Sequence, residues 1–68
     1  MKNDLVLNNN LKSMRTAKGL SQEELARLVG TTRQTVISIE KGTFCPTAKL
    51  ALLFCVALDC KFEELFYF

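Results

Sequence analysis

Residues 31–40 read TTRQTVISIE, and six of these ten side chains are β-branched. Such residues favour a strand by propensity, but as a strand both faces of the segment would mix apolar and charged side chains. As a helix, at about 100° per residue, Thr32, Val36 and Ile39 gather on one side and the polar side chains on the opposite side. This segregation predicts a helix over residues 32–41.

The segment before this stretch predicts a helix that ends directly in front of it. Ser21 is followed three residues later by Glu24, the spacing of a capping box, in which each residue satisfies a backbone N–H of the other. Gly30 favours the left-handed conformation that stops a helix. Two short helices joined by a tight turn make a helix-turn-helix unit over about residues 21–41. The apolar face of its first helix is expected to consist of Leu25, Leu28 and Val29.

Further helices are predicted on both sides of this unit. The asparagines at 8–10 can cap a helix over residues 11–18. A fourth helix is expected from Thr47 to about Leu58, and Asp59 tolerates the left-handed turn that must follow it. Residues 62–65 can form a last helical turn.

The size and charge of the chain suit a small domain with an anionic partner. With 68 residues it is expected to form one domain, 1–68, near the lower limit for a self-sufficient core. Residues 1–49 carry eight Lys or Arg against four Asp or Glu, whereas residues 50–68 carry one against three. A basic body with an acidic end fits a polyanion on one side. An ordinary solvated surface explains the same asymmetry equally well.

Several classes of protein are disfavoured by the composition. Three cysteines without CxxC spacing and no histidine offer no zinc site, and they suit a reducing compartment. The N-terminus lacks the apolar core of a signal peptide, and the longest apolar run, Leu50 to Leu58, is too short to span a bilayer. No acid–base or nucleophile constellation is present, so no enzyme, cofactor or small-molecule ligand is expected. We therefore expect a cytoplasmic protein.

Two stretches of the sequence carry a resemblance to a known family. They are LKSMRTAKGLSQEELARLVGTTRQTVISIEKGTFCP at 11–46 and LALLFCVALDCKFEELF at 50–66. Together they resemble the phage-repressor and Cro-type (XRE) helix-turn-helix regulators, above all the short, single-domain, cytolysin-repressor-like members. The resemblance implies an all-α fold, a compact five-helix lambda-repressor-like DNA-binding domain. It also implies that the third helix enters the major groove of double-stranded DNA.

The resemblance assigns DNA contacts to the helix-turn-helix unit. A bidentate arginine suits guanine and an amide suits adenine, while an exposed isoleucine can touch a thymine methyl. The alternative is that the same helix face only meets water. Positions expected to read bases are Arg33, Gln34, Ile37 and Ser38. Positions expected to contact the DNA backbone are Gln22, Thr32, Lys41 and Thr43.

Arg15 and Glu40 match a pair that forms a salt bridge between the first and third helices of the family. Each lies beside an apolar face of its predicted helix. The pair is therefore expected to anchor the recognition helix without touching DNA.

The fourth helix departs from the family in being apolar on all sides. Leu53 and Val56 fall where relatives often carry polar side chains, which indicates a covered second face. We interpret this face as a homodimer interface, to which Phe66 and Phe68 of the aromatic end contribute. Residues 4–7 and 66–68 can also pair as two short strands, the alternative being that both tails fray.

The resulting hypothesis is a sequence-specific transcriptional regulator, a repressor that binds a palindromic operator as a homodimer on the nucleoid. The alternative is an antitoxin-like or adaptor module that binds another protein through Leu53 and Val56. Cys55 stands where relatives usually have alanine, which favours a small core side chain. Cys45 and Cys60 are expected to be exposed, so thiol sensing stays open as an alternative.

Overall fold

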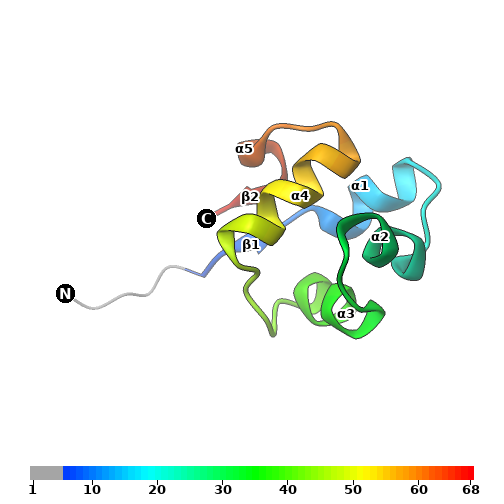
Figure 1. Cartoon of the computed structure of the whole chain (residues 1–68). Coiled ribbons are helices and arrows are strands. Elements are labelled where there is room, and N and C mark those ends of the chain that lie inside the picture. The colour runs from blue at the N-terminus through cyan, green and yellow to red at the C-terminus, as the bar shows by residue number, and fades with distance from the viewer. Residues whose placement is uncertain (1–5) are drawn as a thin grey trace.

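The computed structural model describes residues 6–68 and consists mostly of short helices (Figure 1). Helix α4 runs through the middle of the molecule, with α1, α2 and α3 on one side and α5 with the strands on the other (Figure 1). This arrangement agrees with the predicted five-helix fold. The elements in chain order are β1 (Asn8–Asn9), α1 (Leu11–Ala17), α2 (Gln22–Val29), α3 (Arg33–Lys41), α4 (Ala48–Leu58), α5 (Phe62–Leu65) and β2 (Phe66–Tyr67).

Side-chain caps begin three of the helices where the sequence predicts them. At α2, the Glu24 N–H donates to Ser21 Oγ at 3.0 Å, and the Ser21 N–H donates to Glu24 Oε1 at 2.8 Å. Thr32 and Thr47 accept the same type of bond at the starts of α3 and α4, each at 3.2 Å. These local bonds replace helix hydrogen bonds that the first N–H groups cannot make.

Helices α1 to α4 all end in the same backbone motif. One residue adopts the left-handed conformation, and the N–H of the residue after it donates to a carbonyl five residues back. This pattern is the Schellman motif, in which the bonded pair of residues also brings two side chains together. The left-handed residues are Gly19, Gly30, Gly42 and Asp59. The bonded pairs are Leu20 with Arg15, Thr31 with Ala26, Thr43 with Ser38, and Cys60 with Cys55.

The core lies where the inner faces of the helices meet. Its fully buried side chains are Leu11, Leu25, Val36, Ile39, Phe54, Leu58 and Leu65. The prediction that Leu28 belongs to the apolar face of α2 is wrong, because this side chain is 62% exposed. Ala26 is buried instead, and with Leu25 and Val29 it forms a continuous inner face, whereas Leu28 lies off its edge. Thr32 was also expected on an inner face, but as the cap of α3 it is exposed.

A two-stranded antiparallel sheet joins the two ends of the described chain. Asn8 pairs with Tyr67 and Asn9 pairs with Phe66. The predicted pairing of residues 4–7 with 66–68 is therefore wrong in register, and residues 4 and 5 lie outside the described residues.

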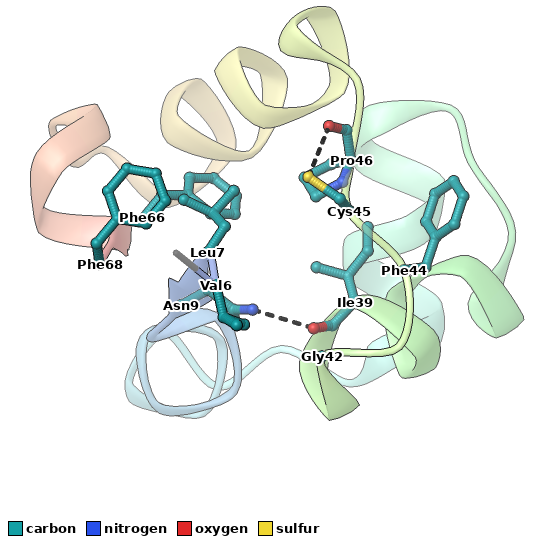
Figure 2. A pocket seen from close by; sticks show the side chains of 10 residues that line it. All are labelled: Val6, Leu7, Asn9, Ile39, Gly42, Phe44, Cys45, Pro46, Phe66 and Phe68. Atoms are coloured by element: carbon teal, nitrogen blue, oxygen red, sulfur yellow. Dashed lines mark hydrogen bonds between the residues drawn. The ribbon is translucent and has the colours of Figure 1, made fainter. Parts of the chain in front are cut away.

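Polar contacts next to the sheet explain this register. Asn9 Nδ2 donates to the carbonyl of Ile39 at 3.0 Å (Figure 2). Asn9 Oδ1 accepts from the N–H of Leu11 at 3.0 Å. The N–H of Asn10 donates to the carbonyl of Leu65 at 2.9 Å. The asparagines thus hold the start of α1 against both α3 and α5, although Asn10 itself makes no side-chain cap.

Helix α4 is the most apolar of the helices, with the sequence AKLALLFCVAL over 11 residues. Within residues 6–68, no helix has the combination of length and apolar character that crossing a membrane requires.

Candidate nucleic-acid interface

The turn between α2 and α3 sets the direction of α3. Gly30 has φ of 77°, and the N–H of Thr31 donates to the carbonyl of Ala26 at 2.9 Å. Ala26 is 2% exposed, so its small side chain lets α3 approach α2 closely. Val36 then packs fully buried beneath α3, which leaves the opposite side of this helix free.

The four predicted base-reading residues share that free side of α3. Arg33 and Gln34 are exposed in its first turn, and Ile37 and Ser38 are partly exposed one turn later. Gln34 Nε2 donates to Ser38 Oγ at 3.3 Å, which steadies the amide without using its oxygen. An amide with a free oxygen and a second free N–H can still make the paired bonds that adenine offers.

Thr43 lies just after the C-terminal end of α3. Its N–H and its Oγ1 both donate to the carbonyl of Ser38, at 3.0 and 3.1 Å. The hydroxyl is therefore turned back toward the helix, with its oxygen still able to accept. Lys41 is exposed in the last turn of α3.

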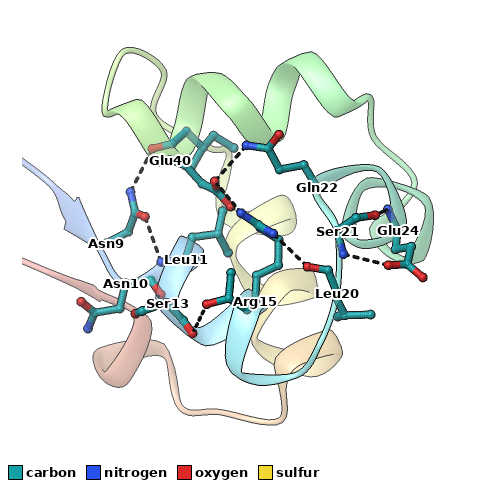
Figure 3. A network of polar contacts seen from close by, with 12 residues as sticks. Asn9, Asn10, Leu11, Ser13, Arg15, Leu20, Ser21, Gln22, Glu24 and Glu40 are labelled. Carbon is teal, nitrogen blue, oxygen red and sulfur yellow. Dashed lines mark hydrogen bonds and ion pairs between the residues drawn. The ribbon is translucent and has the colours of Figure 1, made fainter.

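A buried ion pair fixes α3 against α1. Arg15 Nε lies 2.7 Å from Glu40 Oε2, and Arg15 Nη2 donates to Glu40 Oε1 at 3.2 Å (Figure 3). The two side chains are 9% and 5% exposed, so the expected ion pair is present and shielded from water. Arg15 Nη1 also donates to the carbonyl of Leu20 at 2.8 Å, so this arginine spans two segments.

Gln22 belongs to the same network. Its Nε2 donates to Glu40 Oε1 at 3.1 Å (Figure 3). Gln22 is the first residue of α2, where backbone N–H groups are available to an anion. One amide N–H of the predicted phosphate-contacting side chain is thus already used inside the protein, and its oxygen remains available.

The charges of α3 are arranged to favour an anion. Arg33 and Lys41 are exposed near its two ends, and Glu40 is its one carboxylate. Because Arg15 and Gln22 satisfy Glu40 internally, no free carboxylate of α3 opposes a polyanion. An exposed helix face of this composition, projecting from a tight helix-turn-helix, has the features of a major-groove reader.

Comparison with known proteins supports this reading. The profile of the helix-turn-helix family HTH_3 matches residues 11–65. The chain belongs to this family. Its XRE-type members include the uncharacterised HTH-type transcriptional regulator YgzD of Bacillus subtilis, which is 46% identical over 61 residues and covers 90% of this chain and 92% of its own length.

Further relatives come from archaea and from solved structures. An uncharacterised HTH-type transcriptional regulator of Methanocaldococcus jannaschii is 40% identical over 62 residues, which cover 91% of this chain and 94% of the relative. The crystal structure of the restriction-modification controller protein C.AhdI of Aeromonas hydrophila superimposes with a TM-score of 0.75 at 42% identity, covering 79% of this chain and 82% of that one. The XRE-type protein is thus a transcriptional regulator with a helix-turn-helix DNA-binding domain.

One residue beside α3 was not predicted from the sequence. Phe44 is 50% exposed, and Figure 2 shows its ring on the far side of the α3–α4 loop from Leu7 and Phe66. An aromatic side chain just after the glycine that ends α3 was the signal that could have found it. The residues that line a shallow hollow with Phe44 are Thr32, Gln34, Thr35, Ser38 and Thr43.

The four predicted dimer-interface residues differ in how far they are exposed. Val56 and Phe68 are 78% and 71% exposed, whereas Leu53 is only partly exposed and packs against the core. Phe66 is 3% exposed, so its expected place in an interface needs correction. Its ring lies 5.2 Å from that of Phe62, within the XRE-type protein's own fold.

The exposed apolar surface of α4 and α5 contains two residues that were not predicted from the sequence. Leu52 is 56% exposed and Phe62 is 43% exposed. Both line one open hollow with Val56, and we call these three residues the α4–α5 face. The periodicity of an all-apolar helix could not show which of its sides turns outward.

Proposed function

We propose that this XRE-type regulator binds a palindromic operator as a homodimer, with α3 in the major groove, and represses transcription by covering a promoter. The observation that carries the proposal is the free side of α3, where polar and basic side chains stand without an unpaired carboxylate. A cytoplasmic, nucleoid-associated protein made of one domain, 1–68, fits this role.

Base reading is assigned to the free side of α3. Arg33 can bind guanine O6 and N7 through two N–H groups, and Gln34 can bind adenine N6 and N7. Each such pair contributes about 1–3 kcal/mol of discrimination against a wrong base. Ile37 supplies an apolar contact for a thymine methyl, and Ser38 supplies a hydroxyl that already orients Gln34.

Backbone contacts are assigned to the rim of the same surface. Lys41 is exposed and cationic, and Thr32 and Thr43 present hydroxyl oxygens at the two ends of α3. Gln22 stands at the start of α2, beside free backbone N–H groups. Such contacts set the position of the protein on the duplex and carry no sequence information.

The second copy is assigned to the α4–α5 face. Three exposed apolar side chains that line one hollow are unusual on so small a surface unless a partner covers them. Leu53 supports this face from within, and Phe68 extends the apolar surface at the C-terminal end. A symmetric dimer would place two copies of α3 about 34 Å apart, one helical turn of DNA.

Selection of bound sequences from a random duplex pool tests the assignment. The expected result is a palindrome with half-sites one helical turn apart, bound less tightly as salt rises because phosphate contacts release counterions. Arg33→Ala and Gln34→Ala should each relax the preference at one base pair per half-site, whereas Lys41→Ala should weaken all sequences alike.

The same experiment distinguishes the alternative function. The exposed α4–α5 face also suits an antitoxin-like or adaptor module. Binding of the pool without any enriched sequence, and unchanged by Arg33→Ala, would refute the operator proposal and favour that module.

A further inference from the structure

The C-terminal end of α4 brings two cysteines together. The N–H of Cys60 donates to the carbonyl of Cys55 at 3.0 Å, and the N–H of Asp59 donates to the carbonyl of Val56 at 3.3 Å. These are the two bonds of the Schellman motif, which frequently brings the two flanking side chains into contact. At α1, α2 and α3 the equivalent pairs are Arg15 with Leu20, Ala26 with Thr31, and Ser38 with Thr43.

The backbone geometry permits a bond between the two sulfurs. With a 3.0 Å hydrogen bond joining Cys60 N to Cys55 O, standard bond lengths keep the two Cα atoms within about 7 Å. That distance is the upper limit that a disulfide bridges without movement of the backbone. Both cysteines are free.

One of the two thiols is accessible from outside. Cys60 is partly exposed, whereas Cys55 is 8% exposed. Both line the hollow of the α4–α5 face, together with Val56. In a single copy, where no second copy covers the α4–α5 face, a small reagent that enters this hollow therefore reaches the more exposed Cys60 first.

We propose that Cys55 and Cys60 are a dithiol site that a low-molecular-weight disulfide, of the glutathione disulfide class, converts into an intrachain disulfide. The Cys60 thiolate attacks one sulfur of the reagent, whose S–S bond breaks and releases one thiolate. The Cys55 thiolate then attacks Cys60 Sγ and releases the second thiolate. The two protein thiols are oxidised, the reagent is reduced, and the two protons pass to the two released thiols.

The surroundings of the two cysteines affect the rate of this exchange through the pKa values of the thiols. Burial raises the pKa of the Cys55 thiol, and burial next to Cys55 raises the pKa of the Cys60 thiol. Carboxylates of Asp59, Glu63 and Glu64 act in the same direction on one or other thiol. The thiolate is the reacting form, so the exchange is slow at neutral pH and becomes faster as pH rises.

Lys61 is the cation that faces the same hollow. Its charge offsets one of the two carboxylates, those of Asp59 and Glu64, that line this hollow. The site thus combines an entry, an attacking thiol and a resolving thiol within six consecutive residues, 55–60.

The test uses the full chain with Cys45→Ser, which removes the exposed third thiol. The protein is diluted until sedimentation shows a monomer, so that no second copy covers the hollow. The protein is incubated with glutathione disulfide at several pH values, and intact mass and peptide mapping follow the products. The expected product has lost two hydrogens, keeps no glutathione and carries a Cys55–Cys60 link, and it forms faster at higher pH. A lasting glutathione adduct, a covalent dimer or an unreactive protein would overturn the proposal.

Two controls separate the geometry of the fold from general thiol reactivity. In the Cys45→Ser background, Cys55→Ser should trap a stable glutathione adduct on Cys60, and Cys60→Ser should slow the reaction of Cys55. The equilibrium constant for forming the link should be at least about tenfold larger in the folded chain than in the same chain unfolded in urea. Equal constants in the two states would show that the fold does not build the site.

Discussion

Removing only the cation of the Arg15–Glu40 pair should destabilise the regulator more than replacing both partners. Glu40 accepts two hydrogen bonds from Arg15 and one from Gln22, in a site where its side chain is 5% exposed. Arg15→Met leaves the carboxylate with a single neutral donor and little water. Stranding a buried charge in this way costs about 3–5 kcal/mol.

The double variant Arg15→Met/Glu40→Met removes the buried charge as well. It leaves the Gln22 amide without its partner, at about 1–3 kcal/mol, whereas the Leu20 carbonyl loses its partner in the single and the double variant alike. The double variant should therefore be more stable than the single one. A domain of this size has only about 3–10 kcal/mol of stability, so the single variant stands close to unfolding.

Urea unfolding followed by circular dichroism measures these differences. An osmolyte such as trimethylamine N-oxide keeps the single variant folded enough to compare. The matched control is Arg27→Met, which removes an exposed ion pair to Glu23, with 3.5 Å between Arg27 Nη2 and Glu23 Oε2. This control should change stability by less than about 1 kcal/mol.

The outcome that would refute the reasoning is a single variant as stable as the double variant. That result would mean that water reaches Glu40 once Arg15 is gone. The pair would then not act as a buried brace, and α3 would be held by apolar packing alone.

Three further predictions concern other parts of the molecule. Asp59 has φ of 53°, so Asp59→Gly should relieve backbone strain and raise the free energy of unfolding by up to about 1 kcal/mol. Thermal unfolding measures this change, and a lower melting temperature for the variant would contradict it. Val56→Lys should give a monomer in sedimentation, whereas the matched control Leu28→Lys, on α2, should leave the dimer intact. A Val56→Lys variant that still dimerises would exclude the α4–α5 face as the dimer interface. Hydrogen bonds from Ser21, first its backbone N–H and then its hydroxyl, lower the pKa of Glu24 from 4.5. The contribution of Glu24 to folding stability is therefore present above pH 4.5 and is lost as the pH falls through the lowered pKa. Glu24→Gln should therefore make acid unfolding less steep, and an unchanged acid profile would count against the capping box.

The parts of the fold that local chemistry decides could be predicted from the sequence. Ser21, Thr32 and Thr47 begin helices because each can reach an N–H three residues on. Gly30 and Asp59 end them because both tolerate a positive φ. Such contacts lie within a few residues, so the sequence pattern contains them.

Features that depend on distant partners were beyond such a pattern. Leu28 and Phe66 are both large and apolar, yet one lies outside and the other inside. The strand register depends on Asn9 reaching the carbonyl of Ile39, 30 residues away. The place of Phe44 beside α3 follows from the path of a loop, which no periodicity describes.

The network of Arg15, Glu40 and Gln22 has a consequence for how the preferred DNA sequence can evolve. In the proposed complex, the rotation of α3 about its own axis decides which side chains enter the groove. A rotation by one residue, about 100°, would replace the side chains proposed to read bases. Arg15 on α1 and Gln22 on α2 hold that rotation from outside the groove. Substitutions at these two positions can therefore retune which base sequence is preferred, although neither position is assigned to reading a base.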